Sequence, residues 1–200
     1  MQSLEEALER SAALHGHLCP GQVLGVRLAL VGCRALGIDD PTESRALLVY
    51  VEIDRCAADA IQAVTGCKLG KRTLKFLDYG KVAATFVNVD TNSAFRVVAR
   101  EDSRETAWRY AAPGLDKKAA QLNAYQVMPD EELFTVTRVN LSVPPTDLPG
   151  HPLRRVTCEG CGEGVNDGRE VRLLDMTLCQ ACAYGAYYSR SRPSRQAVRP

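Results

Sequence analysis

Two CxxC motifs near the end of the chain limit most strongly what this region can fold into. Cys158 and Cys161 form the first pair, and seventeen residues later Cys179 and Cys182 form the second. Each pair places two thiolates on one tight turn, and four thiolates satisfy the tetrahedral coordination of Zn²⁺. A segment of about 35 residues also has too small a core to fold without a metal. We therefore predict a zinc site here, against the alternatives of two redox pairs or ordinary buried thiols.

The arrangement around these cysteines predicts a treble-clef finger over residues 156–190. The residues between the pairs indicate a short hairpin, and the second CxxC begins a helix whose dipole favours thiolates. The finger has no clear base-reading helix. We therefore expect it to contact a protein, either a partner or a second copy of the chain. Nucleic-acid binding through the finger and the basic tail 191–200, which we expect to be disordered, is the less favoured alternative.

A proline-rich segment separates the finger from the rest of the chain. Residues 144–152 contain four prolines and one glycine, which predicts a stiff linker over 144–155. The preceding residues, 1–143, are long enough to bury a core of their own. The net charge of the whole chain is only +1, so its overall charge does not favour nucleic acid or membrane.

The first 143 residues have the pattern of an α+β domain. Helices are predicted over 3–14, with a capping box between Ser3 and Glu6, and over 20–36, which is apolar nearly all round and should be central. Further helices are predicted at 56–66 and at 102–127, interrupted at Pro113-Gly114; strands at 45–54, 94–100 and 133–143; and a hairpin at 73–89 that turns at Tyr79-Gly80. Consecutive strands beside segregated helices predict helices packed on an antiparallel sheet.

A group of metal-binding residue types lies between the first two predicted helices. His15, His17 and Cys19 fall within five residues, and a proline follows Cys19 directly. Cys19 should therefore stand at the start of a helix, where the dipole and the free amides favour a thiolate. Cys56 begins another helix directly after a strand. The residues alone leave three interpretations: a metal site, a metal-free thiol–imidazole pair with His17 as the base, or buried cysteines beside hydrogen-bonded histidines.

Four motifs in order give the chain a resemblance to a known family. They are HxHxCPG, CxxDAIQ, GCxxGK and DxGKxA, all within residues 15–83. With the residues around them, they resemble the FmdE family, named for the E subunit of molybdenum formylmethanofuran dehydrogenase, over about residues 5–142. The resemblance implies an α+β core with a helix against an antiparallel sheet, and an intertwined homodimer. Some members of this family add a C-terminal treble-clef zinc finger.

The resemblance also implies a metal-associated site in the core domain. Carried over by motif, the site comprises His15, His17, Cys19 and Cys56, with Asp59, Cys67 and Lys71 nearby. The first choice of ligands is His17, Cys19 and Cys56, which leaves a position for solvent or substrate. Imidazole and thiolate together suit zinc or nickel better than hard cations.

The family name alone does not predict an activity. The sequence has no iron–sulfur run of cysteines and no dinucleotide fingerprint. We expect a dimeric, metal-binding accessory or regulatory factor of molybdenum or tungsten oxidoreductase metabolism, linked to formylmethanofuran or formate dehydrogenase. The alternative is an enzyme with a Cys/His or metal centre that acts on an unknown small molecule, so whether the chain is catalytic stays open. With no targeting segment and no apolar stretch long enough to span a bilayer, we expect a cytoplasmic protein without a membrane partner.

Overall fold

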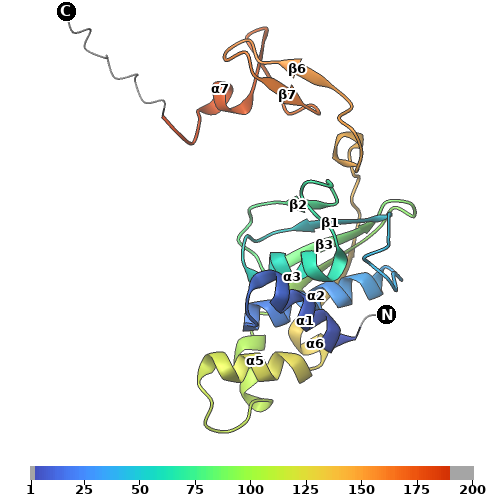
Figure 1. Cartoon of the computed structure of the whole chain (residues 1–200), viewed down its shortest axis with the longest axis vertical. Helices are drawn as coiled ribbons and strands as arrows, with labels where there is room; N and C mark the ends of the chain where they lie inside the picture. The colour runs from blue at the N-terminus through green and yellow to red at the C-terminus, as the bar shows by residue number, and fades with distance from the viewer. Residues whose placement is uncertain (1–2, 190–200) are drawn as a thin grey trace, which may run out of the picture. The chain divides into compact units, whose positions relative to one another are not determined.

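The computed structural model describes residues 3–189, and Figure 1 traces their helices and strands. They form two compact units that divide between Pro144 and Pro145. The tail 191–200, which the sequence predicts to be disordered, lies outside the described residues. Within the described part of the chain, no helix has both the length and the apolar character of a membrane span.

The helices of the first unit follow the sequence prediction closely near the N-terminus. The predicted capping box is present, since the Glu6 amide donates to Ser3 Oγ and the Ser3 amide donates to Glu6 Oε2. The next helix begins at Pro20, as expected for proline in a first turn. The helices are α1 (Leu4–His15), α2 (Pro20–Ala35), α3 (Cys56–Thr65), α4 (Ser103–Thr106), α5 (Lys117–Val127) and α6 (Asp130–Leu133), with a 3₁₀ turn η1 (Ala107–Arg109).

The single helix predicted over 102–127 is divided into separate elements. After η1 the chain turns through Pro113 and Gly114, and Gly114 has a φ of 82° that ends helical geometry. Asp116 then caps a new helix, its carboxylate accepting from the Ala119 amide at 2.8 Å. The interruption expected at Pro113-Gly114 is therefore a full break.

The strands of the first unit form one five-stranded sheet in the order β2-β1-β3-β4-β5. Every neighbouring pair is antiparallel except β1 and β2, which run parallel. The strands are β1 (Leu47–Val51), β2 (Leu74–Phe76), β3 (Ala83–Asn88), β4 (Ser93–Ala99) and β5 (Phe134–Val139). The sheet therefore confirms the predicted α+β class with a mainly antiparallel sheet.

The hairpin predicted over 73–89 is wrong. β1 lies between β2 and β3, so these two strands flank it and do not pair with each other. The backbone of β1 bonds on one side to Thr73 and Leu77, and on its other side the strand pairs with β3. The actual hairpin joins β3 to β4, with Phe86 opposite Phe95. Alternating apolar residues identify a strand but do not specify its partner.

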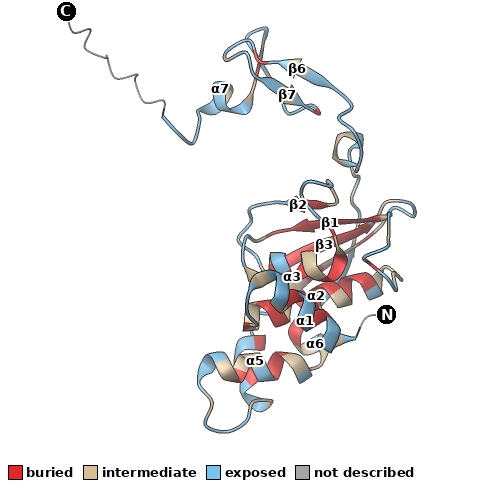
Figure 2. Cartoon of the chain, viewed as in Figure 1, coloured by how far each residue is buried: buried red, intermediate tan, exposed pale blue. Residues whose placement is uncertain are grey.

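Helix α2 is the central helix, as its apolar sequence predicts. It packs against α1, α3, α5 and the sheet, and Figure 2 shows the buried residues gathered where helices face the sheet. Two glycines permit this packing. Gly25 lies against the backbone of α3 at Ala57, and Gly32 lies against the ring of Phe86. Because the same chain covers α2, the apolar character of this helix does not by itself require a second copy of the chain.

Substitution of Gly25 by alanine should destabilise the first unit. The added Cβ would lie 2.6 Å from the Ala57 Cα, and a backbone atom cannot move aside as a side-chain end can. We expect a loss of about 1–2 kcal/mol in the free energy of unfolding, after allowing for alanine's higher helix propensity. Urea denaturation of Gly25→Ala beside Gly70→Ala, whose Cβ would meet no atom within 4 Å, measures this loss. Equal midpoints for the two variants would contradict the close approach of α2 and α3.

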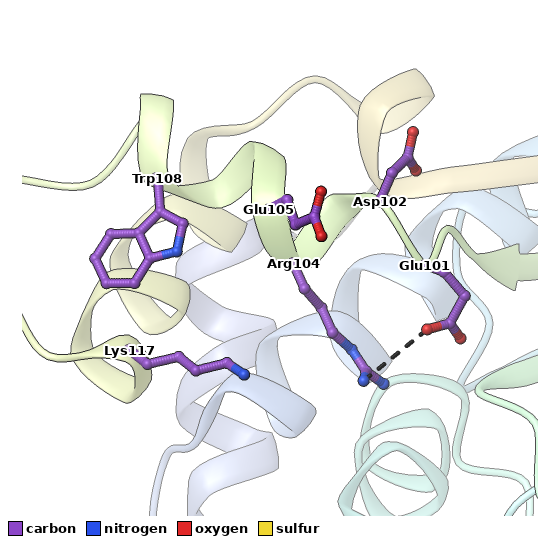
Figure 3. A pocket seen from close by; sticks show the side chains of 6 residues that line it. All are labelled: Glu101, Asp102, Arg104, Glu105, Trp108 and Lys117. Atoms are coloured by element: carbon purple, nitrogen blue, oxygen red, sulfur yellow. Dashed lines mark ion pairs between the residues drawn. The ribbon is translucent and has the colours of Figure 1, made fainter.

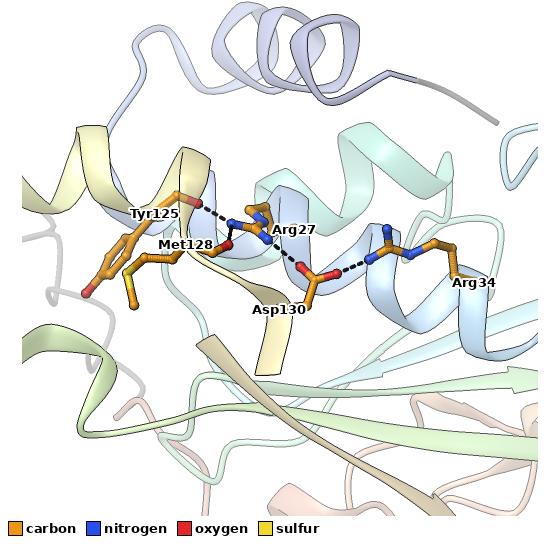
Figure 4. A network of polar contacts seen from close by, with 5 residues as sticks. All are labelled: Arg27, Arg34, Tyr125, Met128 and Asp130. Carbon is orange, nitrogen blue, oxygen red and sulfur yellow. Dashed lines mark hydrogen bonds and ion pairs between the residues drawn. The ribbon is translucent and has the colours of Figure 1, made fainter. Parts of the chain in front are cut away.

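A polar network fixes the end of α5 to α2 (Figure 4). The Arg27 guanidinium donates to the carbonyl oxygens of Tyr125, at 2.9 Å, and Met128, at 2.5 Å. It also pairs with Asp130, which Arg34 contacts from the next turns of α2. These bonds satisfy carbonyl groups that the end of a helix leaves free. The network therefore holds α5 in a defined place beside α2.

The second unit contains two short hairpins followed by a helix, the order predicted for the finger. The hairpins pair β6 (Arg155–Thr157) with β7 (Gly164–Asn166), and β8 (Val171–Leu173) with β9 (Met176–Leu178). Helix α7 (Gln180–Tyr184) follows, and a 3₁₀ turn η2 (Pro145–Asp147) precedes them. The Leu153 amide donates to the Asp167 carboxylate at 2.8 Å, so the end of the predicted linker is bonded to the finger.

Candidate metal centres

The four CxxC cysteines meet at one point of the second unit. Cys158 and Cys161 lie on the turn after β6, Cys179 is the N-cap of α7, and Cys182 lies within that helix. Their four sulfur atoms all lie within 4.8 Å of one another, and the Cys161 and Cys179 sulfurs are 3.9 Å apart. Tetrahedral zinc–thiolate bonds of about 2.3 Å would place the sulfurs about 3.8 Å apart. The cluster therefore has the donor atoms and the size of a metal site.

The electrostatics of this cluster also favour a cation. The Cys179 amide donates to the Cys158 sulfur at 3.1 Å, and this bond chiefly lowers the pKa of Cys158 to about 6. Hydrogen bonding with the thiols of the other three cysteines, Cys179 first, raises the pKa of Cys182 to about 12. One thiolate thus suppresses the ionisation of its neighbours. A bound metal ion would remove this conflict, because it stabilises every thiolate at once.

A second cluster forms at the junction of α1 and α2. His15 is the last residue of α1, Gly16 turns the chain with a φ of 91°, and Cys19 is the N-cap of α2. One ligand atom each from His15, His17 and Cys19 lies within 4.8 Å of the other two. The two imidazole rings are 4.9 Å apart between centroids. The structure therefore brings together three of the four residues that the sequence proposed as core ligands.

Asp59 orients one of these histidines. Its carboxylate lies 2.8 Å from Nδ1 of His15, which reaches it from another helix. Because Nδ1 is engaged, Nε2 is the ring nitrogen left for a metal ion. A carboxylate behind a histidine is a common support for metal ligands, since it fixes the ring and raises its basicity. The position of Asp59 agrees with its expected place near the site.

Cys56, the first residue of α3, contacts the cluster through Cys19. Burial, and next a hydrogen bond with the Cys19 thiol, raise the pKa of Cys56. A Cβ placed on Gly21 would lie 3.6 Å from the Cys56 sulfur and 3.8 Å from the Cys19 sulfur, so both sulfurs flank this glycine. The compact three-residue group contains His15 and not Cys56. It therefore differs by one member from the first-choice ligand set of the sequence.

A buried glutamine that sequence reasoning missed ties the three helices together at this place. Gln22 is fully buried in α2 and donates to the carbonyl oxygen of Cys56 at 2.6 Å. Its own carbonyl oxygen accepts a hydrogen bond from Ser11, which is buried in α1. These bonds fix the end of α1 and the starts of α2 and α3 relative to one another. The signal in the sequence was a glutamine inside an otherwise apolar helix.

Cys67 and Lys71 are not part of this group. Cys67 is buried in the hydrophobic core, where its thiol donates to the Leu47 carbonyl at 3.8 Å and burial raises its pKa. Cys33 is buried in the same core, and burial raises its pKa to about 12. Lys71 is exposed in the turn before β2. The resemblance placed Cys67 near the site, but packing makes it a core residue.

Comparison with known proteins agrees with the geometry. The family model described as "FmdE, Molybdenum formylmethanofuran dehydrogenase operon" matches residues 14–135. A curated protein of Archaeoglobus fulgidus, named "Probable S-adenosyl-L-methionine-binding protein", is 28% identical over 211 residues, which cover 93% of this chain and 54% of that protein. The chain thus spans about half the length of this relative.

A solved structure has the same fold. It is the crystal structure of an FmdE-like protein of tungsten formylmethanofuran dehydrogenase from Syntrophus aciditrophicus, with a TM-score of 0.62 and 22% identity. The match covers 94% of this chain and 96% of the other. The family model spans more than half of the 200 residues, and its range includes both histidines and both cysteines of the core cluster. This chain therefore belongs to the FmdE family.

Proposed function

We propose that this chain is a metal-binding accessory or regulatory factor of molybdenum or tungsten oxidoreductase metabolism, linked to formylmethanofuran or formate dehydrogenase. The observation that carries the proposal is the core cluster of His15, His17 and Cys19 within the FmdE domain. It joins two imidazoles and a thiolate at one helix junction, with Asp59 behind one imidazole. Such a donor set holds a transition metal without requiring catalysis.

Two different metal sites are proposed for each chain. In the finger, Cys158, Cys161, Cys179 and Cys182 would hold a structural zinc ion, because four thiolates leave no open position. In the core, zinc or nickel would bind His17 and Cys19 together with His15, Cys56 or both. A core site with three protein ligands keeps a position for solvent or a small molecule.

Deletion of the gene in a host that has such a dehydrogenase tests the accessory role. We expect the dehydrogenase activity to fall, and the wild-type gene to restore it. Cys19→Ser should fail to restore activity because it removes the core thiolate, whereas Lys118→Gln, an exposed change on α5, should restore it. Full dehydrogenase activity in the deletion strain would refute the proposed role.

A homodimer is the proposed assembly, and the cytoplasm the proposed location. One segment at the β2 edge of the sheet supports a dimer, because it exposes large apolar side chains that a second copy of the chain could cover. These residues are Leu69, Phe76, Leu77 and Tyr79, each between 38% and 63% exposed. A further protein partner is proposed for the finger, where Tyr184 and Tyr187 are exposed.

Light scattering at micromolar concentration should give twice the chain mass of 21.8 kDa. The double variant Phe76→Asp/Leu77→Asp should shift the protein toward the monomer, because two charges would be placed in the apolar contact. Val127→Asp, at an equally exposed apolar residue on α5, is the control and should stay dimeric. A wild-type monomer, or equal dissociation of both variants, would contradict this assignment.

Small-molecule chemistry at the core cluster is the second candidate function. The observation that favours it is a cleft of about 380 Å³ that Cys56 helps to line. The Archaeoglobus relative also carries the name of an S-adenosyl-L-methionine-binding protein, although this chain matches only 54% of its length. Equilibrium dialysis with labelled S-adenosyl-L-methionine tests that ligand. Saturable binding that Cys56→Ser changes would favour this candidate.

A further inference from the structure

The cleft beside Cys56 has an apolar body and a basic rim. It lies within the first unit and is bounded by the starts of α2 and α3 and by α5. Its apolar walls include Leu24, Ile53, Val82 and the buried Tyr125. Its charged lining consists of three cations, Arg55, Arg104 and Lys117, and its lining residues include no carboxylate.

Two of these cations have no ionic partner in the described part of the chain. Arg55 directly precedes α3 and Lys117 is the first residue of α5, and neither forms an ion pair within residues 3–189. Arg104 contacts Glu101 at 3.9 Å, but both side chains are more than half exposed, so this pair is weak. The cleft thus keeps an excess of positive charge beside an apolar wall.

The neighbouring acids lie around a different hollow. That hollow, of about 590 Å³, shares Arg104 and Lys117 with the cleft and is otherwise lined by Glu101, Asp102, Glu105 and Trp108. Figure 3 shows the ends of Arg104 and Lys117 extended on the same side, with Asp102 and Glu105 on the opposite side. An anion would therefore be repelled from the acidic hollow and attracted to the basic cleft.

We propose that this cleft binds a small anionic molecule, a carboxylate or a phosphate joined to an apolar body. The anionic group would lie between Arg55, Arg104 and Lys117, and the apolar body would lie against Leu24 and Tyr125. The volume of the cleft is within the usual range for small-molecule sites. Like charges that converge on an apolar wall repel one another, and an anion between them reverses this cost. The inference depends on the cleft and not on the accessory role.

Calorimetric titration of the full chain, purified with its metals, tests the proposal. Phenyl phosphate and benzoate are the anionic probes, and benzyl alcohol is a neutral probe with the same ring. We expect at least one anion to bind about tenfold more tightly than benzyl alcohol. Lys117→Gln and Arg55→Gln should each weaken that binding about fivefold, while Lys118→Gln, the next residue on α5, should leave it unchanged.

The pattern of results decides the ligand class and the site. Binding of phenyl phosphate alone assigns a phosphate ligand, and binding of benzoate alone or of both extends the site to carboxylates. Failure of both anions to bind, equal binding of benzyl alcohol, or equal weakening by Lys117→Gln and Lys118→Gln would overturn the proposal. Melting curves of the three variants verify that each is folded. Metal content, measured separately, reports on the proposed metal sites and is independent of this outcome.

Discussion

Removal of its metal should unfold the finger while the first unit keeps its helices. Of the described residues after Pro144, Cys158 and Leu178 are the buried apolar ones, and each strand of the two hairpins has three residues. So small a core cannot offset the conformational entropy of the segment, so the metal–thiolate bonds must supply most of the stability. We therefore expect the fold of residues 155–184 to be lost together with the metal.

Limited trypsin digestion before and after chelation measures this loss. Cleavage after Arg155, Arg169 and Arg172 should become at least tenfold faster once the metal is removed, because these residues lie in the finger's own strands and turns. Cys158→Ser should show the fast cleavage without a chelator, and Cys33→Ala, which changes a cysteine of the first unit, should not. Protection of these sites after complete removal of zinc would show that the finger folds without metal.

Local sequence signals predicted the parts of the structure that depend on neighbouring residues. The capping box of Ser3 and Glu6, Pro20 at the start of α2 and the four finger cysteines all act within a few residues of one another. In each case the bonds that form are between groups already close along the chain. The sequence pattern is therefore sufficient for these features.

Pairings between distant segments were less accessible from the sequence. The strand at 74–76 has an apolar pattern that fits a hairpin with β3, but it pairs with β1 because β1 offers a second free edge. The position of Asp59 on Nδ1 of His15 likewise depends on how α3 packs beside α1. The basic cleft combines residues from 20 to 125 and has no contiguous motif. These features exist only once the helices are packed, so no local pattern specifies them.

Loss of Cys19 should reduce the metal content from about two ions per chain to one. Cys19 is buried at the start of α2 and is the thiol of the core cluster, whereas the finger keeps its own four cysteines. Replacement of a thiolate by a hydroxyl removes the strongest donor for a soft metal ion. Elemental analysis after metal-replete expression should therefore give about two metals in the wild-type chain and one in Cys19→Ser. Cys33→Ala, a core cysteine outside both clusters, should retain two.

A metal-free thiol–imidazole pair makes the opposite set of predictions. In that case both wild type and Cys19→Ser contain one metal, and Cys19 is alkylated rapidly in a reaction that slows in His17→Ala. Asp59→Asn separates the accounts further. If His15 binds a metal through Nε2, loss of the carboxylate behind its ring should weaken core metal affinity about 10- to 100-fold and leave the finger metal unchanged. One metal per wild-type chain under replete conditions would exclude the core site, because the finger alone accounts for that ion.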